Sequence, residues 1–231
     1  MHAVLFDMDG TLVDTEGTWG EGLSALARRL GGDLSGPARE AIVGTNMATT
    51  LGILYADLGL QRTERQMLED GLWVQDAVAE MLAGTLDWRP GARELLTSVR
   101  TAGVPAALVT TTPRRLAAGI LRLIDDDLGG RAFDVTVCGD EVPANKPDPA
   151  PYLQAMEALG ADPVGCVAVE DSSAGVRSAL SAGAAVLGVP SMQVLDPAPG
   201  LVVRESLAGV DVADLAEVLD ARDDDLAAAG G

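Results

Sequence analysis

The chain has 231 residues, 48% of them hydrophobic, and a formal net charge of −19 at pH 7. This length accommodates one sizeable hydrophobic core and a modest second unit. The strong acidity argues against nucleic acid or an anionic membrane as partner, because both attract clusters of lysine and arginine. No apolar run approaches the roughly 18 residues that span a bilayer, and the first residues lack the pattern of a secretory signal, so a soluble protein is expected.

Cysteine usage favours a reducing compartment. The two cysteines, Cys138 and Cys166, lie in apolar strand-like surroundings, where the usual role is that of a small core side chain rather than a disulfide or a metal ligand. We therefore predict a cytoplasmic protein and favour a monomer.

The first predicted strand, residues 3–6, leads directly into Asp7-Met8-Asp9-Gly10-Thr11. Two carboxylates one residue apart at the end of an apolar strand repel each other unless a positive group lies between them. Oxygen ligands of this kind suit Mg²⁺, which binds one or two carboxylates and takes further ligands from water and phosphate. For this motif alone a solvated turn is the alternative, since Asp and Gly are common turn residues.

Residues 16–86 form a long interruption before the next predicted strand. Apolar residues at Leu23, Leu26, Ala27 and Leu30 follow the helical period, and the stretch is too long for a simple crossover. We interpret it as an inserted helical cap. The chain returns through residues 88–91, where Pro and Gly mark a boundary. The predicted domains are therefore a core of residues 1–15 and 87–231 and a cap of residues 16–86.

Four further strands are predicted at residues 104–109, 135–138, 167–169 and 185–189, and helical patterns alternate with them. This alternation is typical of an α/β fold in which helices cover both faces of a parallel sheet. In open parallel sheets, ligands bind beyond the carboxyl ends of the strands. The residues that follow each strand are therefore the candidates for a functional site.

Polar residues follow two more strand ends besides the first. The second strand leads into Thr110-Thr111-Thr112-Pro113, and the fourth leads into Glu170-Asp171-Ser172-Ser173. Hydroxyls and N–H groups at a helix start can hold phosphate, whereas an acidic pair can bind a cation or cap the helix. Each segment alone is explained by capping. Three strand ends with compatible chemistry favour a phosphate and metal site.

Lys146, within Asn145-Lys146-Pro147-Asp148-Pro149, is the only lysine among 16 basic residues. An acidic molecule repels an anionic substrate, so a phosphate site in this chain requires local positive charge. A lysine ammonium is a compact point charge, whereas arginine is a broad planar fork. We predict that Lys146 is required for its shape; the alternative is an accident of composition.

These segments resemble the four ordered motifs of the haloacid dehalogenase superfamily. The motifs are Asp7-Met8-Asp9-Gly10-Thr11-Leu12-Val13-Asp14, Thr110, Lys146-Pro147-Asp148-Pro149 and Glu170-Asp171-Ser172-Ser173-Ala174-Gly175. Within the superfamily the chain resembles the phosphatase and β-phosphoglucomutase-like branch, in which a helical cap follows the first strand. The resemblance covers nearly the whole chain. It implies a Rossmann-like core, a Mg²⁺ cofactor and phosphoryl transfer through an aspartyl-phosphate.

The resemblance also implies roles for the acidic residues. Asp7 is expected to be the nucleophile, and Asp9 the general acid and then the general base. The expected metal ligands are Asp7, the backbone carbonyl of Asp9, and Asp171, with Glu170 as a further or outer ligand.

A second group of residues is expected to bind phosphate. By the same resemblance, Thr110 and the N–H of Thr111 hold phosphoryl oxygens, and Lys146 bridges the phosphate and Asp7. Together these groups would stabilise charge in the transition state of phosphoryl transfer.

Other activities in the superfamily fit the sequence less well. A haloacid dehalogenase needs neither a second acid at the position of Asp9 nor an acidic pair such as Glu170-Asp171. β-Phosphoglucomutase carries a cap histidine shortly after its acid–base aspartate. This chain has Trp19 in that region, and its only histidine is His2.

Residues 14–19 instead resemble the corresponding segment of bacterial sugar- or hexitol-phosphate phosphatases. We therefore predict an enzyme that hydrolyses a small phosphomonoester of the sugar or polyol class, with a phosphosugar mutase as the alternative. A non-catalytic phosphate sensor is a third possibility. A sensor would typically lack the nucleophile, the acid or the lysine, but Asp7, Asp9 and Lys146 are all present.

Overall fold

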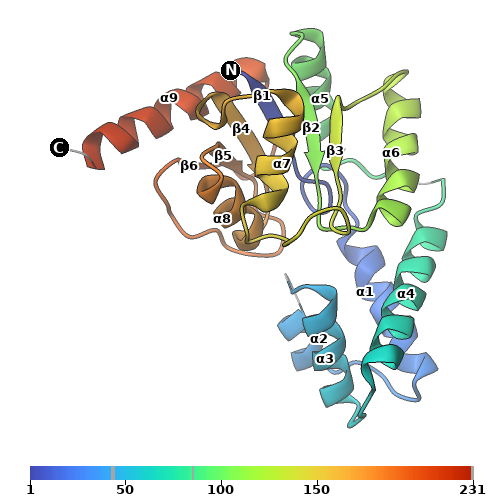
Figure 1. Ribbon diagram of the computed structural model, residues 1–231. Coiled ribbons are helices and arrows are strands. Elements are labelled where there is room, and N and C mark those ends of the chain that lie inside the picture. The colour runs from blue at the N-terminus through green and yellow to red at the C-terminus, as the bar shows by residue number, and fades with distance from the viewer. Residues whose placement is uncertain (43–44, 85, 230–231) are drawn as a thin grey trace. The chain divides into compact units, whose positions relative to one another are not determined.

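The computed structural model describes residues 1–42, 45–84 and 86–229 (Figure 1). The chain divides into two compact units, one formed by Met1–Asp14 with Leu86–Gly231 and the other by Thr15–Thr85. Each junction lies one residue from the predicted domain boundary. Positions 43, 44 and 85 of the predicted cap and positions 230 and 231 of the predicted core lie outside the described residues.

The larger unit contains a parallel sheet with the strand order β3-β2-β1-β4-β5-β6. Its strands are β1 (Ala3–Phe6), β2 (Ala106–Val109), β3 (Val135–Val137), β4 (Cys166–Glu170), β5 (Ala185–Gly188) and β6 (Leu201–Val203). The predicted doubly wound α/β fold is confirmed. The chain builds the sheet outward from β1 to β3 and then crosses to β4, so the strand order reverses between β1 and β4. In open α/β sheets this switch point is where ligands bind.

One strand was not predicted, and the bounds of β2 to β5 differ from the prediction by one or two residues. β6 was not among the predicted strands; it has only three residues and lies partly exposed at the sheet edge. β2 begins at Ala106 rather than at residue 104; Pro105, just before it, has no N–H to donate to a ladder. β4 extends to Glu170, so this carboxylate belongs to the last residue of the strand.

Helices cover both faces of the sheet (Figure 1). They are α5 (Ala92–Thr101), α6 (Arg114–Leu128), α7 (Ala150–Leu159), α8 (Ser173–Ser181) and α9 (Val212–Ala229), with a short 3₁₀ turn at Pro163–Gly165. Ala3 and Leu5 of β1 pack with α7 and α8. The alternate residue Phe6 makes an edge contact with Phe133 at a centroid distance of 6.1 Å. The sheet is therefore buried on both sides.

The structure also describes the two cysteines and the lengths of the apolar helices. Cys138 and Cys166 are both buried and form no disulfide, as expected for core side chains. Within residues 1–42, 45–84 and 86–229, no helix has the length and apolar character needed to cross a membrane.

The smaller unit is helical throughout its regular structure. Its helices are α1 (Glu16–Arg29), α2 (Gly36–Ile42), α3 (Met47–Asp57) and α4 (Glu64–Met81). α1 packs against α4, and α2 against α3. Thr63 and Gln66 form a capping box that starts α4, in which the Thr63 side chain accepts from the Gln66 N–H and the Gln66 side chain accepts from the Thr63 N–H.

A partly buried ion pair fixes the segment between α3 and α4. Asp70 accepts three hydrogen bonds from the Arg62 guanidinium and one, at 2.9 Å, from the hydroxyl of Tyr55. Asp70 is only 7% exposed, so these donors compensate its loss of hydration. Burial, the largest cause, raises the pKa of Tyr55 to about 12, so its hydroxyl stays protonated and donates.

Candidate active site

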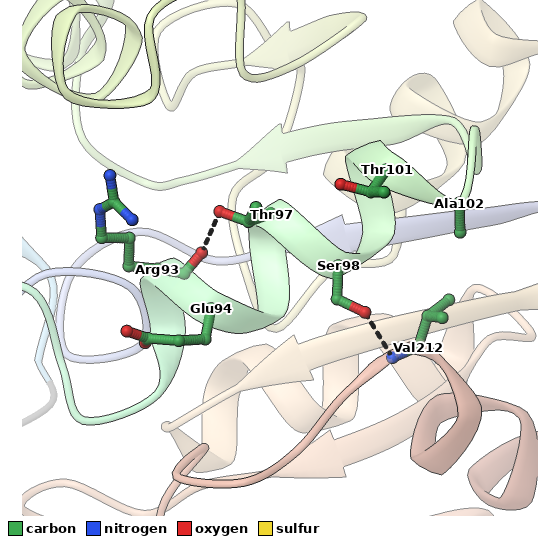
Figure 2. A pocket seen from close by; sticks show the side chains of 7 residues that line it. All are labelled: Arg93, Glu94, Thr97, Ser98, Thr101, Ala102 and Val212. Atoms are coloured by element: carbon green, nitrogen blue, oxygen red, sulfur yellow. Dashed lines mark hydrogen bonds between the residues drawn. The ribbon is translucent and has the colours of Figure 1, made fainter.

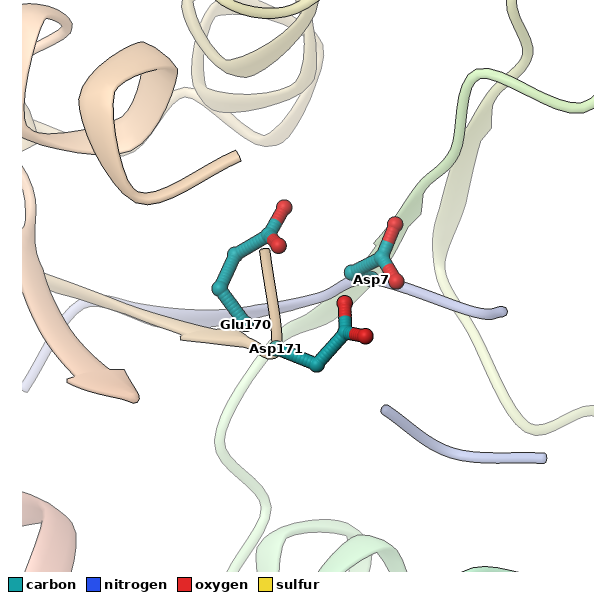
Figure 3. Close-up of side chains that lie close together, drawn as sticks. All are labelled: Asp7, Glu170 and Asp171. Carbon is teal, nitrogen blue, oxygen red and sulfur yellow. The ribbon is translucent and has the colours of Figure 1, made fainter. Parts of the chain in front are cut away.

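Three carboxylates gather at the switch point of the sheet (Figure 3). Asp7 directly follows β1, Glu170 ends β4 and Asp171 follows it. Each can offer an oxygen within 4.8 Å of the others, and all three side chains are buried. The parallel pairing of β1 with β4 brings these residues together although they are far apart in the sequence.

Lys146 lies among these carboxylates. Its Nζ donates to Asp7 Oδ1 at 2.7 Å, to Glu170 Oε1 at 2.6 Å and to the carbonyl of Val109 at 2.8 Å. The lysine side chain is 4% exposed. The only lysine of the chain is therefore the positive charge that this acidic site contains.

Burial is the main influence on the pKa of Asp7. Burial raises the pKa of Asp7 well above its usual value; Lys146 opposes this shift, and Glu170 and Asp171 add to it. Burial acts to lower the pKa of Lys146, but the carboxylates of Asp7 and Glu170 outweigh burial and raise it. Lys146 is therefore charged at neutral pH, and Asp7 needs further positive charge nearby to be fully ionised.

Two glycines make room for the acidic side chains. Gly10 has a φ of +81°, and a Cβ there would lie 2.3 Å from Asp171 Oδ2. A Cβ on Gly175, in the first turn of α8, would lie 2.0 Å from the carboxyl group of Glu170. The glycines of the first and fourth motifs are therefore required by the packing of the site as well as by turn geometry.

Asp9 is held by the threonines that follow β2. Its Oδ2 accepts from Thr112 Oγ1 at 2.7 Å and from Thr110 Oγ1 at 3.3 Å. Thr110 Oγ1 in turn accepts from the N–H of Thr112 at 3.0 Å. Thr111 has an exposed side chain. Thr110 and Thr111 were the predicted site residues of the threonine run; the structure adds Thr112, which makes the shorter bond to Asp9.

Both oxygens of the Asp171 carboxylate are also bound by hydroxyls. Oδ1 accepts from Thr11 at 3.4 Å, and Oδ2 accepts a very short bond from Ser191. Ser191 comes from the segment after β5, and no sequence motif pointed to it. Tyr152 of α7 was missed as well; its hydroxyl donates to Glu170 Oε1 at 2.6 Å.

The donor set fits a divalent cation of the Mg²⁺ type. Three buried carboxylates lie within 4.8 Å of one another, and the Lys146 ammonium pairs with two of them, Asp7 and Glu170. The candidate ligands are hard oxygen atoms, which Mg²⁺ prefers. Asp9 does not belong to this group of three, and its predicted ligand atom is its backbone carbonyl.

A separate groove runs along α5 toward the start of α9 (Figure 2). It has a volume of about 520 Å³ and is lined by Arg93, Glu94, Thr97, Ser98, Thr101, Ala102 and Val212. Ser98 Oγ accepts from the N–H of Val212 at 3.1 Å. None of the predicted site residues lines this groove, so it is distinct from the acidic site.

Comparison with known proteins identifies the family. The sequence model of the haloacid dehalogenase-like hydrolases matches residues 1–183. The chain is 36% identical over 183 residues to a phosphorylated carbohydrates phosphatase of Thermotoga maritima, covering 79% of this chain and 82% of that one. It is 28% identical over 223 residues to hexitol phosphatase B of Escherichia coli, covering 94% and 93% of the two chains.

Solved structures agree with this assignment. The crystal structure of CbbY from Rhodobacter sphaeroides in complex with phosphate superimposes with a TM-score of 0.79 and 26% identity, covering 94% of this chain and 99% of that one. The chain therefore belongs to the haloacid dehalogenase-like hydrolases, and the resemblance inferred from its motifs is confirmed. It is a hydrolase with the Rossmann-like fold of that family.

Proposed function

We propose that the chain is a Mg²⁺-dependent phosphatase that hydrolyses a small phosphomonoester of the sugar or polyol class through an aspartyl-phosphate on Asp7. The observation that carries this proposal is the buried contact of Asp7 with Lys146, beside Glu170 and Asp171. A carboxylate, a compact positive charge and an acidic pair at the adjoining ends of β1 and β4 are the groups that this chemistry would use. The carbohydrate and hexitol phosphatases among its relatives support the substrate class.

In the proposed first step, a carboxylate oxygen of Asp7 attacks phosphorus, and the bond from phosphorus to the substrate oxygen breaks. Asp9 gives its proton to the departing alkoxide. In the second step Asp9 takes a proton from water, whose oxygen attacks phosphorus and releases phosphate from Asp7. The hydroxyl of Thr112 holds the Asp9 carboxylate in place for both proton transfers, and the hydroxyl of Thr110, whose bond to Asp9 is longer, turns to the phosphoryl group when substrate binds.

The remaining residues bind charge. Lys146, Thr110 and the N–H of Thr111 are proposed to stabilise the phosphoryl oxygens, whose charge is spread over three atoms in the transition state. Asp7, Asp171 and the carbonyl of Asp9 would hold Mg²⁺, with Glu170 behind them. When bound, the cation supplies positive charge that offsets the repulsion between carboxylate and phosphate.

The proposed cellular setting follows from the cysteines. Cys138 and Cys166 are buried and unpaired, and burial raises the pKa of each thiol to about 11. Such thiols are inert, and they are typical of a reducing compartment. We propose a cytoplasmic, monomeric enzyme acting on a phosphorylated metabolite.

The test is release of inorganic phosphate from a panel of sugar, polyol and nucleotide monophosphates, with Mg²⁺ and then with a chelator. We expect Mg²⁺-dependent release from one or a few sugar or polyol phosphates, and none from the Asp7→Asn variant, since an amide is not nucleophilic. Substantial turnover by that variant would contradict the assignment of Asp7. No release from any compound by folded protein would favour a mutase or a sensor instead.

A further inference from the structure

Tyr152 is a fully buried tyrosine whose polar end contacts the active site. It lies on α7 with 0% exposure. Its hydroxyl donates to Glu170 Oε1 at 2.6 Å, and its ring centroid lies 5.1 Å from the Nζ of Lys146. Glu170 Oε1 therefore has two donors, the tyrosine hydroxyl and the lysine ammonium. Ser172 donates to the other oxygen of the same carboxylate at 3.2 Å.

The hydrogen bonds of Lys146 limit how it can bind a substrate. An ammonium has three hydrogens. Three acceptors already lie within 2.8 Å of Nζ: Asp7 Oδ1, Glu170 Oε1 and the Val109 carbonyl. A phosphoryl oxygen can make a full hydrogen bond to this lysine only by taking the place of one of them.

Glu170 is the acceptor that can best lose the lysine. The contact with Asp7 holds the nucleophile, and the Val109 carbonyl is fixed at the end of β2. When Lys146 turns away from Glu170, Oε1 still accepts from Tyr152 and Oε2 from Ser172. If the tyrosine hydroxyl were absent, Glu170 Oε1 would lose both of the donors described above when Lys146 leaves. Removing hydrogen-bond donors from a fully buried carboxylate costs considerable free energy.

We propose that Tyr152 is a positioning residue that holds Glu170 while Lys146 exchanges this carboxylate for a phosphoryl oxygen. This role rests on the proposed phosphatase function and deepens it. The tyrosine touches neither the phosphoryl group nor Asp7 in this scheme. By holding Glu170, it allows Lys146 to leave this carboxylate and bind a phosphoryl oxygen.

The chain offers a direct probe of this exchange. Because it contains one lysine, protein labelled with ¹⁵N-lysine gives a single side-chain ammonium signal by NMR, that of Lys146. Titration with inorganic phosphate at saturating Mg²⁺ is expected to shift this signal. The shift yields a dissociation constant for phosphate that does not depend on turnover.

The matched variants are Tyr152→Phe and Tyr55→Phe. Each substitution removes one hydroxyl that donates to a buried carboxylate paired with a cation. The carboxylate is Glu170 of the proposed active site for Tyr152, and Asp70 of the helical unit for Tyr55. For Y152F we expect phosphate binding weakened about tenfold, as is typical when a group that orients a ligand is lost. Hydrolysis by Y152F should fall in parallel, and Y55F should match the wild type in both measurements.

Two results would overturn the proposal. One is a lysine signal that phosphate does not move in the wild type, and the other is equal phosphate affinity in Y152F and the wild type. If the wild type hydrolyses no phosphomonoester but its lysine signal responds to phosphate in a Tyr152-dependent way, the proposed activity fails and the positioning role stands. The two failures are therefore distinguishable.

A second measurement covers the case in which Y152F does not fold. The chain has two tyrosines, so protein containing 3-fluorotyrosine gives two ¹⁹F signals, and Y55F assigns them. Phosphate with Mg²⁺ is expected to shift the Tyr152 signal and leave the Tyr55 signal in place. A Tyr152 signal that phosphate does not move would contradict the exchange.

Discussion

Lys146 shows how a single residue type is fixed by its surroundings. Its Nζ is enclosed by Asp7, Glu170 and the carbonyl of Val109, and the side chain is 4% exposed. Three acceptors around one point match the three hydrogens of an ammonium. A guanidinium is planar, larger and unable to place one nitrogen among three converging oxygens. The preference for lysine at this position therefore has a geometric cause.

We accordingly predict that Lys146→Arg keeps the fold but lowers phosphate release at least about a hundredfold, the usual effect of losing one donor to a developing anion. The positive charge is retained in this variant, so a lower rate of phosphate release would be due to the different shape of the arginine side chain. Turnover is measured at saturating Mg²⁺, and circular dichroism verifies the fold. An exposed substitution, Arg65→Lys on α4, serves as the control that leaves activity unchanged. Wild-type kinetics in K146R would show that any cation suffices.

At the scale of elements, the start of α8 is fitted closely to the end of β4. Gly175 belongs to the helix and would normally be replaced by alanine with a gain in helix stability. Here the added methyl would lie 2.0 Å from the Glu170 carboxyl group, which Lys146, Tyr152 and Ser172 hold in place. The helix therefore forgoes some intrinsic stability to accommodate the site.

Gly175→Ala is expected to displace Glu170 and to lower turnover at least about tenfold. The control is Gly119→Ala on α6, where a Cβ meets nothing within 4 Å. That substitution should raise the free energy of unfolding by about 0.5–1 kcal/mol and leave activity intact. Both variants are compared by urea unfolding and phosphate release. Full activity of G175A would mean that the position of Glu170 is not critical.

A second interface between elements involves Arg114 at the start of α6. Its guanidinium donates to both oxygens of Glu141 at 2.6–2.7 Å and to the Thr136 carbonyl of β3 at 2.7 Å. Glu141 also accepts from the N–H of Cys138 at 2.9 Å. The hydrogen bonds from Arg114 are the main cause that lowers the pKa of Glu141 below its usual value of 4.5.

This lowered pKa gives a pH prediction for stability. A carboxyl whose pKa is lower in the folded state stabilises the fold above its unfolded pKa, and this contribution is lost as the pH falls through the folded pKa. Glu141→Gln should therefore lower the free energy of unfolding by about 1 kcal/mol or less at pH 7, since the pair is partly exposed. The difference in the free energy of unfolding between this variant and the wild type should disappear at pH values below the pKa of Glu141 in the folded protein.

The measurement is urea unfolding at pH 7 and at several lower pH values down to about 2, which lies well under the ordinary carboxyl pKa of about 4, so that the pH at which the difference vanishes is observed directly. Glu157→Gln, at an exposed position on α7, is the control and should show little difference at any of these pH values. A deficit of E141Q that persists unchanged in acid would show that the contact does not depend on the charge of Glu141.

At the scale of the whole molecule, the net charge of −19 opposes the approach of an anionic substrate. The positive charge of Lys146 is buried, so it acts at short range, whereas the surface carboxylates act over the Debye length. The surface charge therefore repels a phosphomonoester at long range, whereas Lys146, together with the Mg²⁺ proposed for the site, would attract it at short range.

We predict that kcat/KM for an anionic phosphomonoester rises when NaCl is increased from about 0.01 M to about 0.1 M, because the Debye length falls from about 30 Å to about 10 Å. Mg²⁺ is kept saturating, and kcat should change little because the buried contacts are screened less. A fall in kcat/KM over this range would indicate that attraction near the site dominates the encounter.

Much of the fold was predictable because its signals are local. Strands β1 to β5 are short apolar runs, and each is followed by turn or helix signals that the next few residues carry. The pairs Asp7 with Asp9 and Glu170 with Asp171 could be assigned to strand ends for the same reason. β6 could not, since three partly exposed residues at a sheet edge carry too little pattern.

The parallel α/β core, the helical insertion, the family and the candidate site residues could all be inferred from the sequence, because strand periodicity and motif spacing lie within short segments. Only the tertiary structure decided the partners of each carboxylate. Tyr152 reaches Glu170, Ser191 reaches Asp171 and Thr112 reaches Asp9. These contacts join segments 18 to 103 residues apart, and they depend on strand order and helix packing, which no local pattern encodes.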